Sequence, residues 1–230
     1  MRNENFLRQY SESIKRCELF RGISDGDLAT ILRFSHFRQV PKDYVLAWQD
    51  EACPAIYCVA AGSIIVKHTT QPNQTTVLGY VQNGETIGEA FIFCEAGSPA
   101  ALTTGEESML LVIEAAPFQR YIQQHPKLAM RVMANISRQL SSMVAYVARL
   151  KTYNAEQRVA SYILQHDSQE MFPYAMNGLA HRRRDLAELL GIKPETLSRV
   201  ISRFKNSGWI TADHGVFDVI DREQLTAVLG

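Results

Sequence analysis

One segment, from Arg183 to Phe204, constrains the fold of this 230-residue chain more than any other. Gly191 divides it into two short stretches with helical spacing, at a point where a residue free to adopt a positive φ is needed. Pro194 then begins the second stretch, at a helix position where its missing N–H costs nothing. The positions that would pack the two helices together are apolar: Leu186, Ala187, Leu190, Ile192, Leu197 and Val200. The pattern predicts a helix-turn-helix.

Charge distinguishes this segment from an ordinary helical hairpin, which the apolar spacing alone also allows. Residues 182–205 contain seven Lys or Arg and three Asp or Glu, a local balance of +4, although the whole chain has a formal net charge of +0. A neutral chain with one basic module suits a duplex DNA ligand better than a generally adhesive surface. The polar positions that we expect to face the DNA major groove are Glu195, Thr196, Ser198, Arg199 and Arg203.

The composition is that of a folded protein without a membrane span. Hydrophobic residues make up 46% of the chain, and its length allows two small domains or one large domain. No apolar run approaches the roughly 20 residues of a membrane-spanning helix, and the N-terminal segment lacks the apolar centre of a signal peptide. We therefore expect a cytoplasmic protein with no membrane partner.

The four cysteines do not have the close spacing of a zinc ribbon, and they are Cys17, Cys53, Cys58 and Cys94. In a cytoplasmic protein we expect them to be reduced and to pack as small hydrophobic residues. A metal, cluster or redox role is the alternative.

The first half of the chain changes from helical to β-rich. Residues 1–35 are helical in character, and Ser24 precedes two acidic residues as a helix start prefers. Short β-rich pieces follow at 44–48, 55–62, 63–70, 75–81, 101–105 and 108–114, with turn-forming residues separating several of them. Many short strands at regular spacing predict a closed antiparallel barrel or jelly roll.

A long helix is predicted at 127–153, directly after Pro126. Its apolar positions are spaced as in an a/d heptad seam: Ala129, Met133, Ile136, Leu140, Met143, Val147 and Leu150. A helix that packs only on its own domain is one alternative. Because the 3.5-residue period persists over about three heptads, we expect a parallel partner helix and a homodimer.

The remaining segments complete a three-part plan. We expect an amphipathic helix at 155–166, a polar loop at 167–180, and a β-hairpin formed by 209–212 and 216–220 after the helix-turn-helix. The predicted fold class is α+β, with an N-terminal antiparallel β-roll sensor domain at 1–125, a dimerisation helix at 126–153 and a winged helix-turn-helix domain at 154–230.

The order of these parts, together with two motifs, resembles the CRP/FNR superfamily of bacterial transcription regulators over nearly the whole chain. The first motif is Gly84–Glu89 (GETIGE) with Phe93 following, which is similar to the GxxxGE turn of the sensor domain. The second is Glu195–Arg199 (ETLSR), the ExxSR pattern of the FNR-like branch. The resemblance implies a cyclic-nucleotide-binding-like β-roll, a dimer on DNA, a small-molecule or gas effector and a contact with RNA polymerase. The effector pocket that it implies contains Gly88, Glu89, Ala100 and Ala101.

The effector segment departs from the cyclic-AMP-binding members of that superfamily. Those members carry an Arg that pairs with the cyclic phosphate and a Ser or Thr after it, whereas this chain has Pro99 and Ala100. A phosphate buried without a cationic partner is strongly unfavourable, so cyclic AMP is disfavoured. An iron–sulfur cluster of the FNR type is disfavoured as well, because Cys17 is the one cysteine near the N-terminus.

The closest similarity within the superfamily is to the nitric-oxide-responsive regulators of denitrification, the DNR-like branch. The matching pieces are Glu89-Ala90 with Phe93, Lys151 with Asn154-Ala155, Arg158-Val159, and Ile192 with Pro194 before the ExxSR motif. This resemblance implies haem as one candidate cofactor, with another effector, such as a cyclic nucleotide, or none as the alternative. A haem iron would need an axial ligand, which His36, His68, His125 or a cysteine could supply, and no motif selects one.

Residue chemistry assigns different roles within the helix-turn-helix. Arg199 can donate two hydrogen bonds to a guanine edge, Glu195 can accept one from cytosine, and Ser198 can contact either type of base pair. The side chains expected to hold phosphates are Thr196, Lys193 and Arg203. A solvated helix face is the alternative for Arg203. The ExxSR resemblance implies two TTGA-type half-sites related by two-fold symmetry.

Two rival classes have different requirements. A cupin-like β-barrel enzyme would carry His-x-His and Glu ligands for a metal, and the sequence has no His-x-His, no GxSxG and no GxxxxGK[ST] motif. We therefore expect no enzyme. An architectural DNA-binding protein with a vestigial barrel would bind its operator with the same affinity whether or not a small molecule is present.

Overall fold

A computed structural model describes residues 6, 9, 10, 12–15, 17, 19, 20, 23–71, 74–167, 183–213 and 216–230. The chain divides into two compact units, Met1–Gln139 and Leu140–Gly230. The division falls within a single long helix, α4 (Pro126–Thr152).

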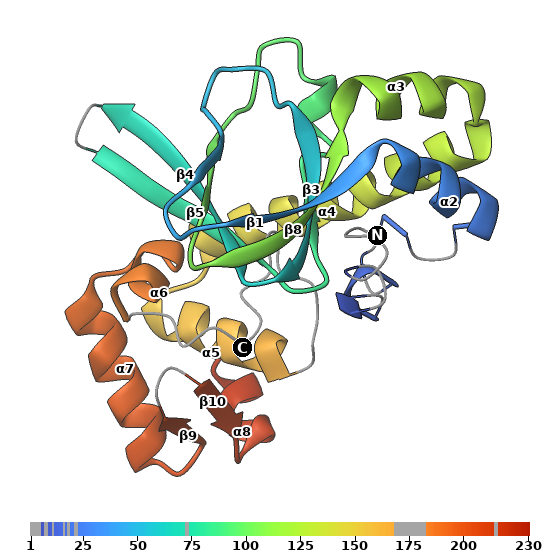
Figure 1. The fold of residues 1–230 in the computed structure, drawn as a ribbon. Helices are drawn as coiled ribbons and strands as arrows, with labels where there is room; N and C mark the ends of the chain where they lie inside the picture. Colours follow the sequence, from blue (N-terminus) through green and yellow to red (C-terminus); the bar gives the residue numbers. More distant parts are fainter. Residues whose placement is uncertain are drawn as a thin grey trace. The chain divides into compact units, whose positions relative to one another are not determined.

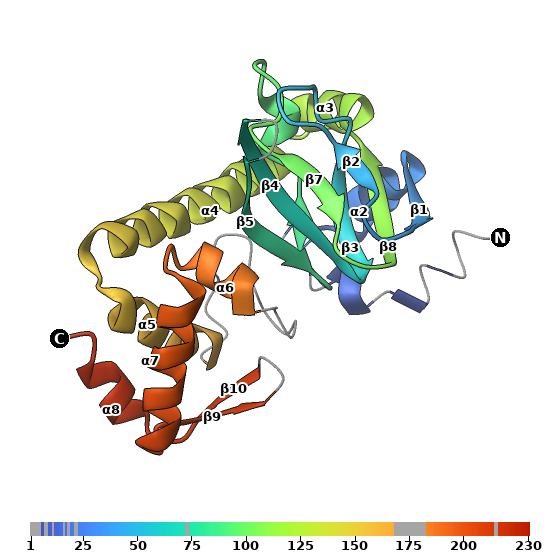
Figure 2. The ribbon, with the colours of Figure 1, turned by 90° about the vertical axis from the view of Figure 1, so that its left-hand side faces the viewer.

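Two four-stranded antiparallel sheets make up most of the first unit (Figures 1 and 2). One sheet has the order β1 (Ser35–Val40), β8 (Ser108–Glu114), β3 (Ala55–Ala61) and β6 (Thr86–Ile87). The other has the order β2 (Val45–Ala47), β7 (Ala101–Thr104), β4 (Ser63–Gln71) and β5 (Gln74–Gln82). Neighbouring strands are often distant in the chain, as in a jelly roll. The predicted α+β class with an N-terminal β-roll, a long helix and a C-terminal helix-turn-helix is confirmed.

The core of the first unit comes from strands that are apolar on at least one face. β3 is buried along nearly its whole length, and near its start Ile56 pairs with Ile113 of β8, both with no exposed area. In the second sheet Ile64 and Leu102 are fully buried as well. The six predicted strand segments all coincide with observed strands, because burial produces the apolar runs from which they were predicted.

Two strands and one α-helix of this unit are absent from the sequence prediction. Residues 1–35 were expected to be helical, but helix α2 (Asp25–Arg33) ends earlier and β1 begins at Ser35. β1 is an edge strand with only its two terminal residues buried, so its hydrophobic pattern is weak. β6 is short and depends on its pairing with β3. Helix α3 (Ala115–Gln124) was also missed.

Helix caps and one long-range hydrogen bond hold the helices of the first unit. The Ser24 hydroxyl accepts a hydrogen bond from the Asp27 backbone N–H at 3.1 Å, which confirms the predicted start of α2. The Tyr121 hydroxyl of α3 donates to the Asp27 carboxylate at 2.7 Å and so connects α3 with α2. A short 3-10 helix, η1 (Phe91–Phe93), follows the GETIGE turn.

The second unit is a winged helix-turn-helix, in which Figure 2 shows α7 and the β9–β10 hairpin beside α5. Its elements after α4 are α5 (Ala155–Asp167), α6 (Arg183–Leu189), α7 (Pro194–Asn206), β9 (Ile210–Asp213), β10 (Val216–Val219) and α8 (Arg222–Ala227). Leu197 and Phe204 of α7 are fully buried, and Tyr162 of α5 meets Phe217 of β10 edge-to-face. Most of the predicted loop at 167–180 and the hairpin turn at His214-Gly215 lie outside the described residues.

The cysteine prediction needs one correction. Cys17 and Cys58 are paired as a disulfide, with a Cα–Cα distance of 7.1 Å, whereas all four cysteines were expected to be reduced. Cys58 belongs to β3, and no local spacing reports a contact between residues 41 positions apart. Cys53 is free and buried, and Cys94 is free and exposed.

Within the described ranges, no helix combines the length and the apolar character that crossing a membrane requires.

Candidate functional site

The turn between α6 and α7 has the geometry predicted for it. Gly191 has a φ of 61°, a left-handed conformation that a side chain would disfavour. The backbone N–H of Ile192 donates to the Ala187 carbonyl at 3.0 Å, and Ala187 is completely buried between the helices. Pro194 occupies the first turn of α7, with Lys193 as the N-cap residue.

Helix α7 buries one face and leaves the predicted reading residues on the other. Its buried positions are Leu197, Val200, Ile201 and Phe204. Lys193, Glu195 and Arg199 are exposed, and Thr196 and Ser198 are half-buried. Within the described part of the chain, the Glu195 and Arg199 side chains have no intramolecular partner, so both are free to bind a ligand.

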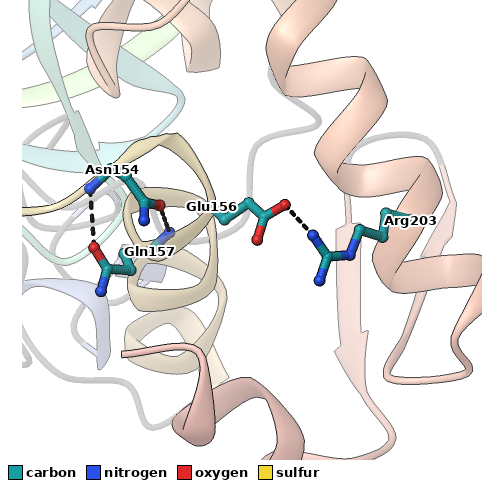
Figure 3. A network of polar contacts seen from close by, with 4 residues as sticks. All are labelled: Asn154, Glu156, Gln157 and Arg203. Carbon is teal, nitrogen blue, oxygen red and sulfur yellow. Dashed lines mark hydrogen bonds and ion pairs between the residues drawn. The ribbon is translucent and has the colours of Figure 1, made fainter. Parts of the chain in front are cut away.

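Arg203 differs from its neighbours because it forms an ion pair with Glu156 of α5 (Figure 3). The two side chains are 56% and 35% exposed. A groove of about 460 Å³ lies between the start of α5 and α7, and it is lined by Asn154, Ala155, Glu156, Thr196, Arg199, Val200 and Arg203. Three of the six predicted DNA-contacting residues therefore line one groove.

A reciprocal pair of hydrogen bonds caps the start of α5. The Gln157 backbone N–H donates to Asn154 Oδ1 at 3.0 Å, and the Asn154 backbone N–H donates to Gln157 Oε1 at 2.9 Å (Figure 3). This capping box fixes where the helix begins. It consequently holds Glu156, which lies between the two capping residues, at the rim of the groove.

Arg158 connects three backbone segments around the helix-turn-helix, although sequence reasoning gave it no structural role. Its guanidinium donates to the carbonyls of Leu150, at the end of α4, and of Tyr153, at 2.6 and 2.9 Å. It also donates to the carbonyls of Leu190 and Gly191 at 3.1 and 3.2 Å. Arg158 therefore joins the end of α4 to the turn that precedes α7.

The predicted seam of α4 contains large apolar side chains with much of their surface exposed. Met133, Leu140 and Val147 are 52%, 60% and 48% exposed, and Ile136, Met143 and Leu150 are half-buried. Met130 and Val144 are 64% and 62% exposed as well, although the sequence prediction did not include them. An apolar stripe of this kind on a monomer is typical of an interaction surface.

In the predicted effector segment, a glycine turn and a buried acid lie beside β3. Gly88 has a φ of 112°, and a Cβ at this position would lie 2.6 Å from the Ala55 carbonyl oxygen. Glu89 is 1% exposed and accepts a hydrogen bond from the Thr86 hydroxyl. Burial raises the pKa of the Glu89 carboxyl and favours its neutral form.

The next residues of the predicted effector segment, Pro99 and Ala100, have backbone carbonyls in contact with neighbouring polar side chains. Ala100 is 2% exposed, and its carbonyl accepts a hydrogen bond from the Ser98 hydroxyl at 2.6 Å. Pro99 is exposed, and its carbonyl oxygen lies 3.1 Å from His68 Nδ1. Ala101 begins β7 and is half-buried.

Glu85 is a second acid in the GETIGE turn whose environment the sequence does not predict. Its carboxylate accepts a hydrogen bond from the Gln82 backbone N–H at 2.9 Å. Burial raises its pKa to about 7, and this hydrogen bond opposes only part of the shift.

The three candidate histidine ligands have different surroundings. His36 is exposed on β1. His125 stacks on Tyr121, and its Nδ1 lies 2.7 Å from the Tyr121 carbonyl. His68 is half-buried, with Nδ1 on the Pro99 carbonyl of the effector segment. Metal-binding histidines commonly use one ring nitrogen in this way and bind the metal through the other. Among the described residues, no cluster of three or more His, Cys, Asp or Glu could hold a metal ion.

Known proteins match both halves of the chain. Residues 37–125 match the cyclic nucleotide-binding domain family, and residues 157–228 match the Crp-like helix-turn-helix domain family. The chain is 24% identical over 195 residues to the cAMP-activated global transcriptional regulator CRP of Escherichia coli O157:H7, an alignment that covers 84% of this chain and 92% of the relative.

Two solved structures have the same fold. FixK2 from Bradyrhizobium japonicum aligns with a TM-score of 0.73 and 18% identity, covering 84% of this chain and 96% of that chain. DNR from Pseudomonas aeruginosa aligns with a TM-score of 0.52 and 24% identity, covering 96% and 98%. Both alignments run from the β-roll into the helix-turn-helix unit.

Proposed function

Since the chain belongs to the CRP/FNR family of DNA-binding transcription regulators, we propose that it binds, as a homodimer, an operator of two TTGA-type half-sites under the control of an effector in the β-roll. The observation that carries this proposal is the exposed face of α7. Among the residues that the structure describes, Arg199 and Glu195 have no intramolecular partner there, and they have the chemistry to read guanine and cytosine.

Contacts with the DNA backbone are assigned to residues beside Glu195 and Arg199, the two side chains proposed to contact bases. Lys193 is exposed at the start of α7, and Thr196 lines the groove next to Arg199. A cation or a hydroxyl at these positions would bind phosphate and set the register of the helix without reading sequence.

The dimer is proposed to form through the exposed stripe of α4. Met133, Leu140 and Val147 are separated by seven residues, so they recur on one side of the helix. A second α4 packed along this stripe would remove their apolar surface from water. Two recognition helices related by a two-fold axis then explain why the operator has two half-sites.

The direct experiment is selection of bound sequences from a pool of random DNA duplexes. We expect recovered sequences to contain two TTGA-type elements in inverted orientation, with centres about one helical turn apart. Recovery of sequences with no shared element would contradict the proposed operator.

The effector is proposed to differ from cyclic AMP. Pro99 and Ala100 provide no cation for a cyclic phosphate, and Ala100 is buried. The buried Glu89 with its raised pKa adds no positive charge. Isothermal titration with cyclic AMP is expected to give no saturable heat, and a saturable isotherm would contradict this assignment.

Haem is the candidate cofactor that we propose, and His68 is the residue that would bind its iron. The half-buried imidazole already has Nδ1 on the Pro99 carbonyl, which leaves Nε2 for iron, so this residue fits the ligand role. A bound haem would supply an iron that takes nitric oxide. His68 would hold the iron, and the Pro99 carbonyl would orient the imidazole.

The test is an anaerobic absorbance titration with haem, followed by nitric oxide. We expect a Soret band that saturates at about one haem per chain and shifts with the gas. His68→Ala should weaken the titration, whereas the matched control His36→Ala on the exposed strand should not. A titration that does not saturate, or that His68→Ala leaves unchanged, would contradict the assignment.

A further inference from the structure

The groove between α5 and α7 brings two arginines of the recognition helix close to one acid. Arg199 and Arg203 line the groove from α7, and Glu156 lines it from the first turn of α5. Arg199 has no intramolecular partner among the described residues, whereas Arg203 is paired with Glu156. Two arginines on the same helix therefore differ in the charge that they present to a ligand.

The ion pair largely cancels the charge of Arg203. Its Nη1 donates to Glu156 Oε1, so a guanidinium charge and a carboxylate charge lie in direct contact at the rim of the groove (Figure 3). A nearby DNA phosphate would be attracted by Arg203 and repelled by Glu156 at almost the same distance. The attraction that remains is small, although other donors of the guanidinium are still available.

The pair is not explained by a need for stability. Both partners are partly exposed, and exposed ion pairs contribute little to the free energy of folding. An acid in the first turn of α5 interacts favourably with the helix dipole, but this effect does not require Arg203 as a partner. The position of the pair in the groove beside Arg199 therefore points to a role in DNA binding and not in folding stability.

We propose that Glu156 masks Arg203, which means that its negative charge offsets the positive charge of Arg203. Glu156 thereby determines how strongly the helix-turn-helix domain binds the DNA backbone. This inference rests on the proposed DNA-binding function. In the presence of Glu156 the backbone contact is weak, and binding depends on base reading by Arg199. Without Glu156, Arg203 becomes an additional phosphate contact that acts equally on every sequence.

Glu156→Gln tests this proposal, because it removes the charge and keeps the shape of the side chain. One additional phosphate contact steepens the dependence of log K on log salt by about 0.9, which corresponds to an affinity increase of about eightfold at 0.1 M salt. We expect this increase on both the operator and a scrambled duplex, measured by fluorescence anisotropy between about 0.05 and 0.2 M salt.

Glu223→Gln is the matched control. Glu223 is an exposed glutamate in the first turn of α8, in the same unit, so its replacement changes the net charge and the helix start in the same way. Because the groove residues do not include Glu223, we expect its replacement to leave the salt slope nearly unchanged.

A double-mutant cycle with Arg203→Gln identifies the route by which Glu156 acts. We expect Arg203→Gln alone to bind DNA more weakly than the wild type, because it leaves the Glu156 carboxylate without its cationic partner. The double variant Glu156→Gln/Arg203→Gln should return to about the wild-type affinity and salt slope, because neither charge is then present. Three results would overturn masking: a loss of affinity in Glu156→Gln, an affinity of the double variant that stays as high as that of Glu156→Gln, or a gain of equal size in Glu223→Gln. DNA binding by the wild-type protein tests the underlying function, so failure of that function is visible before any variant is compared.

Discussion

At the scale of single residues, Glu85 makes stability depend on pH. Its pKa is about 7 in the folded chain and near 4.5 when unperturbed, so between these values the folded chain holds a proton that the unfolded chain releases. Below about pH 4.5 Glu85 does not lower the free energy of unfolding, because its carboxyl is protonated in both the folded and the unfolded chain. The free energy of unfolding should then fall as the pH rises to about 7, by roughly 3 kcal/mol for a shift of this size.

Urea unfolding at about pH 5 and pH 8 measures this contribution. The wild type should lose more stability between the two pH values than Glu85→Gln, because the amide cannot ionise. Glu89 also has a raised pKa and contributes equally to both proteins, so the comparison isolates Glu85. Parallel pH profiles would show that Glu85 is not buried as described.

Two arginines of α7 have different environments that the local sequence does not predict. Arg199 and Arg203 have the same chemistry and lie one helical turn apart, so the sequence distinguishes them only by the ExxSR motif. The structure separates them through Glu156, which is 47 residues away from Arg203 along the chain. A contact of this kind depends on the packing of α5 against α7, which no local pattern reports.

At the scale of elements, the apolar stripe of α4 can be tested directly. Leu140→Glu should produce monomers and abolish operator binding, because it places a charge in the proposed helix–helix seam. Ala145→Glu is the matched control, since Ala145 is exposed on the opposite side of the same helix. Analytical ultracentrifugation distinguishes the two states, and a monomeric wild type or a dimeric Leu140→Glu would contradict the seam.

Loss of the Arg158 side chain should destabilise the helix-turn-helix domain. Arg158→Ala removes the donor from four backbone carbonyls at the end of α4 and in the helix-turn-helix turn. We expect the free energy of unfolding to fall by about 1–3 kcal/mol. Arg199→Ala is the control for loss of an arginine, because Arg199 forms no hydrogen bond or ion pair among the described residues. Equal stability of the two variants, measured by chemical denaturation, would contradict the role assigned to Arg158.

The predictability of the elements depended on how much of each is buried. Six strand segments, each with a run of apolar residues, and the helices α5 to α7 were predicted closely from their local patterns. β1 presents mostly exposed residues at a sheet edge, and β6 exists only through pairing with β3. The Cys17–Cys58 pair likewise joins residues that are 41 positions apart in the chain. These features depend on tertiary contacts and not on local pattern.

At the scale of the whole molecule, α4 is the element shared by the two units. The division of the chain falls within this helix, so the β-roll and the helix-turn-helix are joined by one continuous backbone segment. An effector that favours one arrangement of α4 over another would shift the population of DNA-binding dimers. An architectural protein without this coupling would bind DNA with the same affinity in the presence and absence of its effector.

The measurement that tests the central claim is the affinity of the wild type and of Arg199→Ala for an operator with two inverted TTGA-type half-sites and for its scrambled counterpart. We expect the wild type to prefer the operator by a factor of about 10³ or more. Arg199→Ala should bind both duplexes weakly, with similar affinity and strong salt dependence. A wild type without preference, or an Arg199→Ala variant that keeps the full preference, would contradict the account.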